Sequence, residues 1–137
     1  MKGVDKEEEQ WLQELMALYE QAAPLIQNSA KLNADGLPAD LKSLVEANEK
    51  LPSILESVKK MRKPKRKDFR NIKKDFEKVL FTCIKAGESG VKLVDSMAHG
   101  DWQITQRMRF TNVVNWMQQA AISYESLSKR LTSLSTK

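Results

Sequence analysis

One stretch of this chain, from Phe69 to Met97, carries an apolar residue or a glycine at every alternating step of three and four residues. This spacing places all of these residues on one side of an α-helix and is typical of helices that pack lengthwise against each other. A β-strand would instead show alternation with a period of two. The positions are Phe69, Ile72, Phe76, Val79, Cys83, Ala86, Gly90, Leu93 and Met97.

Three further segments show the same periodicity, so we predict helices near residues 5–33, 38–62, 68–98 and 101–134. Additional apolar residues widen each stripe beyond the seam of a two-stranded coiled coil, as expected for a helix that contacts two neighbours. The connections are short, which makes consecutive helices antiparallel. We therefore predict an all-α protein with a single domain, residues 1–137: an antiparallel up-down-up-down four-helix bundle made of two αα-hairpins. The fourth stripe consists of Phe110, Val113, Met117, Ala120, Tyr124, Leu127, Leu131 and Leu134.

Glycine and proline mark the three breaks between these segments. Gly36 and Pro38 fall between the first and second, Pro64 follows the second, and Gly100 follows the third. Glycine is favoured just after a helix and proline at its first turn, so these residues predict helix ends and helix starts.

Two aspartates and two prolines add details to the helical pattern. Asp68 and Asp101 precede the third and fourth apolar stripes and are expected to be N-caps. Pro24 and Pro52 fall inside helical patterns, and each is expected to kink or split its helix because proline lacks the backbone N–H.

The composition favours a protein of a reducing compartment. Cys83 is the single cysteine, so no disulfide can form within the chain. The first residues are acidic and lack the apolar core of a signal peptide, and no apolar run approaches the roughly 18 residues that span a membrane. We expect a cytoplasmic location.

The sequence contains no recognisable catalytic or cofactor motif. His99 is the only histidine, so no two-histidine metal site can form within one chain. Ser96, His99 and Asp101 have the residue types of a hydrolase triad, but they lie at a helix end and its turn, and closeness in sequence does not create triad geometry. No glycine-rich phosphate loop is present. We therefore expect neither catalysis, nor a metal, nor a cofactor.

The segment from Lys59 to Lys74 holds ten basic residues against one acid, Asp68, a net charge of +9. The whole chain is +5, so the remainder is net −4. Helix dipoles favour cations at the end of the second helix but disfavour them at the start of the third. Acidic residues at the start of the chain, Glu7, Glu8, Glu9 and Asp5, are expected to lie opposite and offset part of this charge. The basic residues are Lys59, Lys60, Arg62, Lys63, Lys65, Arg66, Lys67, Arg70, Lys73 and Lys74.

A surplus of positive charge suits an anionic partner, which can be an acidic protein surface, nucleic acid or anionic lipid headgroups; a solvated loop without a partner is the structural alternative. The preferred interpretation is a non-enzymatic interaction or adaptor module that contacts an acidic partner through this segment. The alternative is nucleic-acid binding by the same segment. A third interpretation is a small apolar ligand in the bundle core, next to a band of small residues. That candidate core pocket comprises Cys83, Gly87, Gly90 and Phe110.

The fourth segment also has many uncharged polar residues, a composition that suits contact with another chain because interface cores are depleted in charge. A homodimer through an uncharged polar face of this helix is therefore a hypothesis, and the alternative is an exposed helix with few charges. The residues are Gln103, Thr105, Gln106, Asn112, Asn115, Gln118, Gln119, Ser123 and Ser126.

Overall fold

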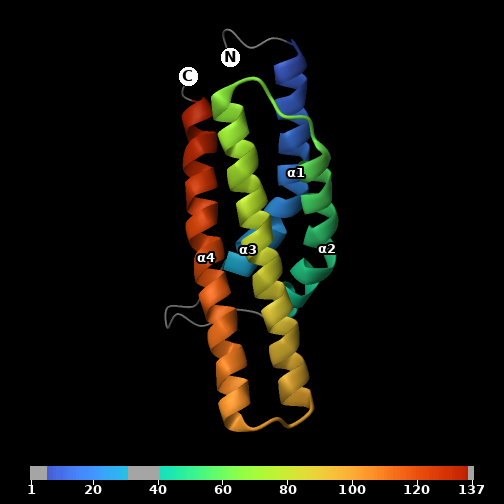
Figure 1. The fold of residues 1–137 in the computed structure, drawn as a ribbon, viewed down its shortest axis with the longest axis vertical. Coiled ribbons are helices and arrows are strands. Elements are labelled where there is room, and N and C mark those ends of the chain that lie inside the picture. Colours follow the sequence, from blue (N-terminus) through green and yellow to red (C-terminus); the bar gives the residue numbers. More distant parts are fainter. Residues whose placement is uncertain (1–5, 31–40, 136–137) are drawn as a thin grey trace.

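The computed structural model describes residues 6–30 and 41–135. Within these residues the chain forms four helices and no strand: α1 (Lys6–Ala30), α2 (Leu41–Lys60), α3 (Lys67–Ala98) and α4 (Gln103–Ser135). The helices run alternately down and up, and the start of α1, the α2–α3 connection and the end of α4 lie at the same end of the molecule (Figure 1). The predicted all-α, up-down-up-down four-helix bundle is confirmed.

Within the described residues, the helix bounds agree with the predicted ones to within two residues. The second helix ends at Lys60 rather than near residue 62, and the fourth begins at Gln103 rather than near residue 101. The break at Gly36 and Pro38 lies outside the described residues, as do the predicted end of the first helix at residue 33 and the predicted start of the second at residue 38.

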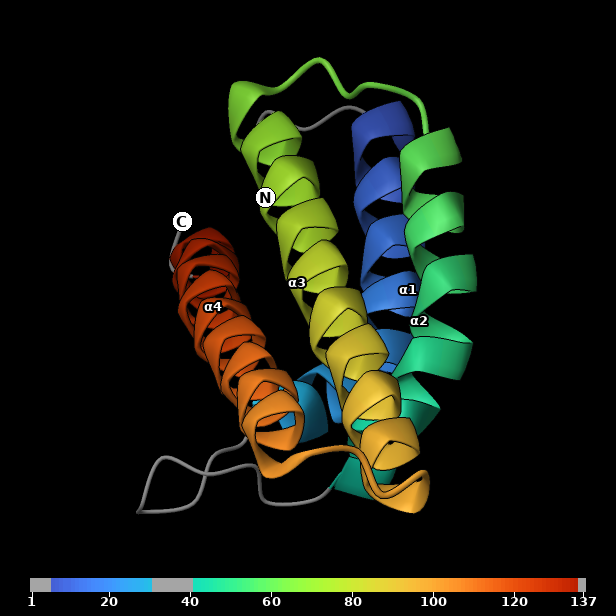
Figure 2. The ribbon, with the colours of Figure 1, turned by 60° about the horizontal axis from the view of Figure 1, so that its bottom comes forward.

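Helix α3 is the central helix of the bundle, which explains its long apolar stripe. It contacts α1, α2 and α4, whereas α2 and α4 do not contact each other within the described residues. Figure 2 shows α4 at one edge of the bundle and α2 at the other. The buried core under these contacts comprises Trp11, Leu15, Ala22, Ile26, Leu51, Ile54, Val58, Phe69, Ile72, Phe76, Val79, Leu80, Cys83, Ile84, Ala120 and Leu127.

The hairpin of α3 and α4 extends past the ends of α1 and α2 (Figure 1). In this part α3 and α4 bury a smaller cluster of Ala86, Leu93, Val113 and Met117 between themselves. Met97, the last residue of the predicted α3 stripe, is 55% exposed. This last position of the stripe lines an open groove with Leu93 and Phe110, where only two helices pack together.

The turn between α3 and α4 has the geometry of a Schellman motif. Gly100 has a φ of +67°, its N–H donates to Met97 O at 3.2 Å, and the N–H of Asp101 donates to Ser96 O at 3.0 Å. The Asp101 carboxylate accepts a hydrogen bond from Ser96 Oγ at 2.6 Å, while His99 Nδ1 lies 2.7 Å from Asp95 O. Asp101 thus stabilises the turn and is not the N-cap of α4, which begins two residues later.

Neither proline splits its helix. Helix α1 continues through Pro24 and α2 continues through Pro52. Both prolines are exposed, so water can replace the hydrogen bond that a proline nitrogen cannot donate.

Because the core is filled, we predict that replacing two phenylalanines of α3 by alanine lowers the stability of the protein to very different extents. Phe76 is fully buried and contacts Tyr19 edge-on, whereas Phe81 is 47% exposed. We expect Phe76→Ala to lower the free energy of unfolding by about 3–5 kcal/mol because it leaves a cavity. The matched variant Phe81→Ala should lower it by less than about 1 kcal/mol. Urea denaturation followed by circular dichroism measures both, and equal losses would contradict this packing.

Candidate anion-binding site

Residues 61–66 connect α2 to α3, and we call them the joint. The joint packs against the start of α1 through Trp11, which is 2% exposed. Trp11 Nε1 donates a hydrogen bond to Arg62 O at 2.8 Å, and its ring stacks on Phe69 with centroids 5.7 Å apart. One aromatic side chain of α1 therefore contacts both the joint and the first turn of α3.

The carboxylate of Glu8, one turn before Trp11, holds the joint from the same side. Glu8 is 3% exposed, and its Oε1 accepts hydrogen bonds from Lys65 N at 3.0 Å and from the Arg62 guanidinium at 3.3 Å. The same guanidinium donates to Glu7 O at 2.7 Å. The expected contact between early acids and the basic segment is thus made by the side chain of Glu8 and the backbone of Glu7, while Asp5 lies outside the described residues.

Arg66 and Arg70 stabilise the start of α3, where cations oppose the helix dipole. Arg66 forms two hydrogen bonds to Asp68, at 3.0 and 2.7 Å, and its guanidinium lies 4.7 Å from the centre of the Phe69 ring. The Asp68 carboxylate raises the pKa of Arg66 above its ordinary value. Arg70 donates to the backbone oxygens of Pro64 and Lys65.

Asp68 is not the N-cap of α3. The N-cap is Arg66, and Asp68 lies in the first turn, where its Oδ1 accepts a hydrogen bond from Phe69 N at 2.9 Å. The Asp68 carboxylate still stabilises the start of α3, because it interacts favourably with the helix dipole and pairs with Arg66.

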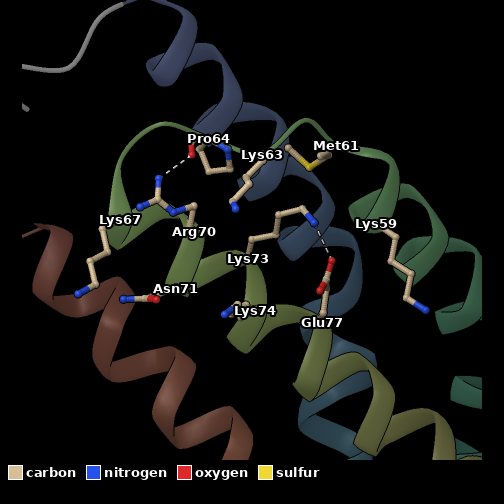
Figure 3. Close-up of a pocket in the computed structure, with 10 residues that line it drawn as sticks. All are labelled: Lys59, Met61, Lys63, Pro64, Lys67, Arg70, Asn71, Lys73, Lys74 and Glu77. Atoms are coloured by element: carbon tan, nitrogen blue, oxygen red, sulfur yellow. Dashed lines mark hydrogen bonds and ion pairs between the residues drawn. The ribbon is translucent and has the colours of Figure 1, made fainter.

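The lysines of the segment are arranged differently from the arginines. Five of the seven lysines, together with Arg70, line a hollow of about 550 Å³ between the end of α2 and the first turns of α3 (Figure 3). Lys73 pairs with Glu77 at 2.8 Å. Among the described residues, the ammonium groups of Lys59, Lys63, Lys67 and Lys74 form no ion pair. The lining residues are Lys59, Met61, Lys63, Pro64, Lys67, Arg70, Asn71, Lys73, Lys74 and Glu77.

The structure thus divides the ten predicted basic residues. Six line the hollow, whereas Lys60, Arg62, Lys65 and Arg66 do not. Lys60 lies 3.9 Å from Glu56 on the exposed side of α2. Asn71 and Glu77 were missed by the sequence analysis, although their spacing of three to four residues from Lys67, Lys73 and Lys74 on one helix face could have indicated them.

The charge of the hollow favours an anion. Six cationic side chains face one acid, Glu77, around a concave surface, and like charges that repel each other are stabilised when an anion enters between them. Lysine ammonium groups are flexible point charges with three donors each, so they adapt to carboxylates in many geometries.

The predicted core pocket lies elsewhere, in two different environments. Cys83, Gly87 and Gly90 are buried in α3. Phe110 packs against the smaller core cluster and lines an open groove of about 600 Å³ with Leu93 and Met97. Apolar ligand binding at these residues stays a prediction.

The predicted uncharged polar face of α4 is not a single surface. Ser123 is buried, Gln106 Nε2 donates to Asp101 O at 2.7 Å, and Ser126 Oγ donates to Asp75 at 3.5 Å. Asn115 and Gln118 are exposed on the outer side of the helix. The predicted residues therefore point in several directions around α4, and only part of the set shares an exposed side.

Within residues 6–30 and 41–135, no three His, Cys, Asp or Glu side chains gather in an arrangement that could hold a metal ion. None of the helices in that part of the chain combines the length and the apolar character needed to cross a bilayer. Comparisons of the chain with protein-family models, with curated proteins and with solved structures found no match.

Burial also decides the reactivity of Cys83. Loss of solvation raises the pKa of its thiol to about 12, so the unreactive neutral form predominates at pH 8. We expect Cys83 of the folded protein to react with a maleimide or a disulfide reagent at least tenfold more slowly than in urea, where the pKa returns to about 8.5. A spectroscopic thiol assay measures both rates. Equal rates would contradict a buried thiol.

The contact between Glu8 and the joint leads to a second prediction. Glu8→Gln keeps the shape of the side chain but loses its charge toward Arg62, which is itself partly exposed. We expect the free energy of unfolding to fall by about 1–2 kcal/mol, and the Lys65 amide to exchange its proton faster. The matched control is Glu7→Gln, since Glu7 contributes its backbone oxygen; it should change stability by less than about 0.5 kcal/mol. Equal effects would contradict the assigned role of Glu8.

Proposed function

We propose that this protein is a non-enzymatic interaction or adaptor module that binds an acidic protein segment in the lysine-lined hollow. The single observation that carries the proposal is the group of Lys59, Lys63, Lys67 and Lys74 around one concave surface without ion pairs among the described residues. A peptide with several carboxylates would neutralise these charges and bury the exposed lysine stems. A cytoplasmic location belongs to the same proposal, because the only cysteine is a buried free thiol.

An acidic protein segment suits the hollow better than a nucleic acid does. The aromatic rings at the joint, Trp11 and Phe69, are 2% and 0% exposed and are not available to stack on bases. Arg62, Arg66 and Arg70 use their guanidinium groups within the joint, and arginine is the side chain best suited to bidentate contacts with phosphates and base edges. The surplus of positive charge also lies at one end of the bundle, in residues 59–74, and the rest of the chain is net acidic, whereas a nucleic-acid-binding domain usually has a broad basic face.

The test compares two triple variants that lose the same charge. Lys63→Gln, Lys67→Gln and Lys74→Gln remove three lysines of the hollow, and Lys85→Gln, Lys92→Gln and Lys129→Gln remove three others outside it. Binding of a fluorescent glutamate-rich peptide is measured by anisotropy at about 0.15 M salt. We expect the first variant to weaken binding about 10- to 50-fold, since each exposed charge pair contributes up to about 1 kcal/mol, and the second to weaken it less than about threefold.

Two outcomes of this experiment would overturn the proposal. One is equal weakening in both variants, which would indicate a response to net charge alone. The other is tighter binding of a single-stranded oligonucleotide than of the peptide under the same conditions, lost in the hollow variant, which would assign the site to nucleic acid. A pull-down with the wild-type protein and the hollow variant then identifies cellular partners.

A further inference from the structure

Helix α4 carries apolar side chains on the side that faces away from the bundle. Ile104, Met108 and Ile122 are 68%, 63% and 62% exposed, although the same helix buries Val113 and Met117 on its inner side. The exposed residues belong to a second stripe with steps of four, three, four, three and four residues. We call it the outer stripe: Ile104, Met108, Thr111, Asn115, Gln118 and Ile122.

All six residues of the outer stripe are exposed, and no helix of the described chain covers them. α4 contacts α3 and α1, both on its inner side, and stands at the edge of the bundle (Figure 2). Two shallow hollows follow the stripe, one of about 330 Å³ beside Ile104 and Met108 and one of about 410 Å³ beside Asn115 and Gln118. A surface of this shape can receive side chains from another helix.

The alternating steps of four and three residues are the spacing of a coiled-coil seam. In that pattern Met108, Asn115 and Ile122 occupy a positions, and Ile104, Thr111 and Gln118 occupy d positions. The stripe contains no charged residue, so no charge loses its hydration when a partner helix covers it. We propose that a second copy of this chain binds along the outer stripe, with the two α4 helices antiparallel.

A twofold axis near residue 113 makes the outer stripe complementary to itself. Ile104 then faces Ile122 of the second copy, and Met108 faces Gln118. Thr111 faces Asn115 at the centre. Both isoleucines at the ends of the stripe thus lose their exposure to water, the Gln118 stem covers Met108, and the polar Thr111 and Asn115 meet at the centre.

Charge favours the antiparallel orientation over the parallel one. Arg107 is an exposed cation beside the stripe. The antiparallel pair separates the two Arg107 residues by about 18 Å along the axis, well beyond the screening length of about 8 Å at physiological salt. A parallel pair would place them at the same height. The antiparallel helices also bring opposite ends of their dipoles together.

The extent of the stripe determines how strong this dimer can be. Its length is about 27 Å at 1.5 Å per residue, so two interlocked helix faces would bury on the order of 1,000 Å² in total, near the lower limit for specific interfaces. An interface of this size suits a weak, reversible dimer. If the proposed function also holds, such a dimer carries its two lysine-lined hollows at opposite ends, because the hollow lies at the start of α3, which is at the same end of the molecule as the end of α4 (Figure 1). It could then bridge two acidic segments.

Sedimentation velocity on the full chain from about 1 to about 500 µM tests the dimer. We expect the wild-type sedimentation coefficient to rise with concentration, and Ile122→Glu to weaken association at least tenfold. The matched control is Val94→Glu, which places the same charge at an apolar residue of α3 that is 40% exposed; it should associate as the wild type does. A wild-type monomer throughout this range, or equal loss in both variants, would overturn the proposal.

Cross-linking tests the orientation. Ile104→Cys and Ile122→Cys are made separately, and the buried Cys83 does not compete for the reagent. A short bismaleimide should link the two variants only after they are mixed, since residue 104 of one copy faces residue 122 of the other. Efficient linkage of Ile122→Cys alone would overturn the antiparallel register. Neither experiment measures peptide binding, so failure of this dimer and failure of the proposed function are distinguishable.

Discussion

The buried carboxylate of Glu8 determines how the α2–α3 joint sits on the bundle. It accepts hydrogen bonds from the Lys65 backbone and from the Arg62 guanidinium, while Trp11 bonds to the Arg62 backbone and stacks on Phe69. A carboxylate that is 3% exposed is costly to bury unless such partners surround it. The start of α1 and the joint therefore depend on each other, and the position of the joint decides which basic side chains remain at the surface.

Arginines and lysines of the basic segment have different positions because their head groups differ. A guanidinium is planar and carries five donors, so Arg62, Arg66 and Arg70 can each bond to backbone oxygens or a carboxylate within the joint. An ammonium group is compact and strongly hydrated, and most of the lysines keep theirs in solvent. Part of the net charge of +9 therefore belongs to arginines that hold the joint in place. Another part belongs to lysines without ion pairs among the described residues, and it supports the proposed binding of an acidic segment.

The unequal lengths of the two hairpins give α4 a second exposed surface. α3 and α4 extend beyond α1 and α2, and α4 has no contact with α2 in the described part of the chain. Its inner stripe completes the bundle, whereas its outer stripe carries isoleucine and methionine into solvent. Packing within the bundle therefore explains the apolar residues of the inner stripe of α4 but not those of the outer stripe.

Periodicity and turn chemistry in the sequence were enough to predict the helices, their antiparallel order and the break at Gly100, because these features depend on residues close in the chain. The basic segment was also visible from composition. The role of Glu8 was expected only as one of several acids, since its burial depends on the distant Arg62 and Lys65. Asp68 and Asp101 were wrongly predicted as N-caps, because their partners Arg66 and Ser96 determine where their carboxylates point. The burial of one face of α4, the exposure of the other and the separate roles of Arg62, Arg66 and the hollow-lining lysines depend on the packing of helices far apart in sequence, which local sequence patterns do not show.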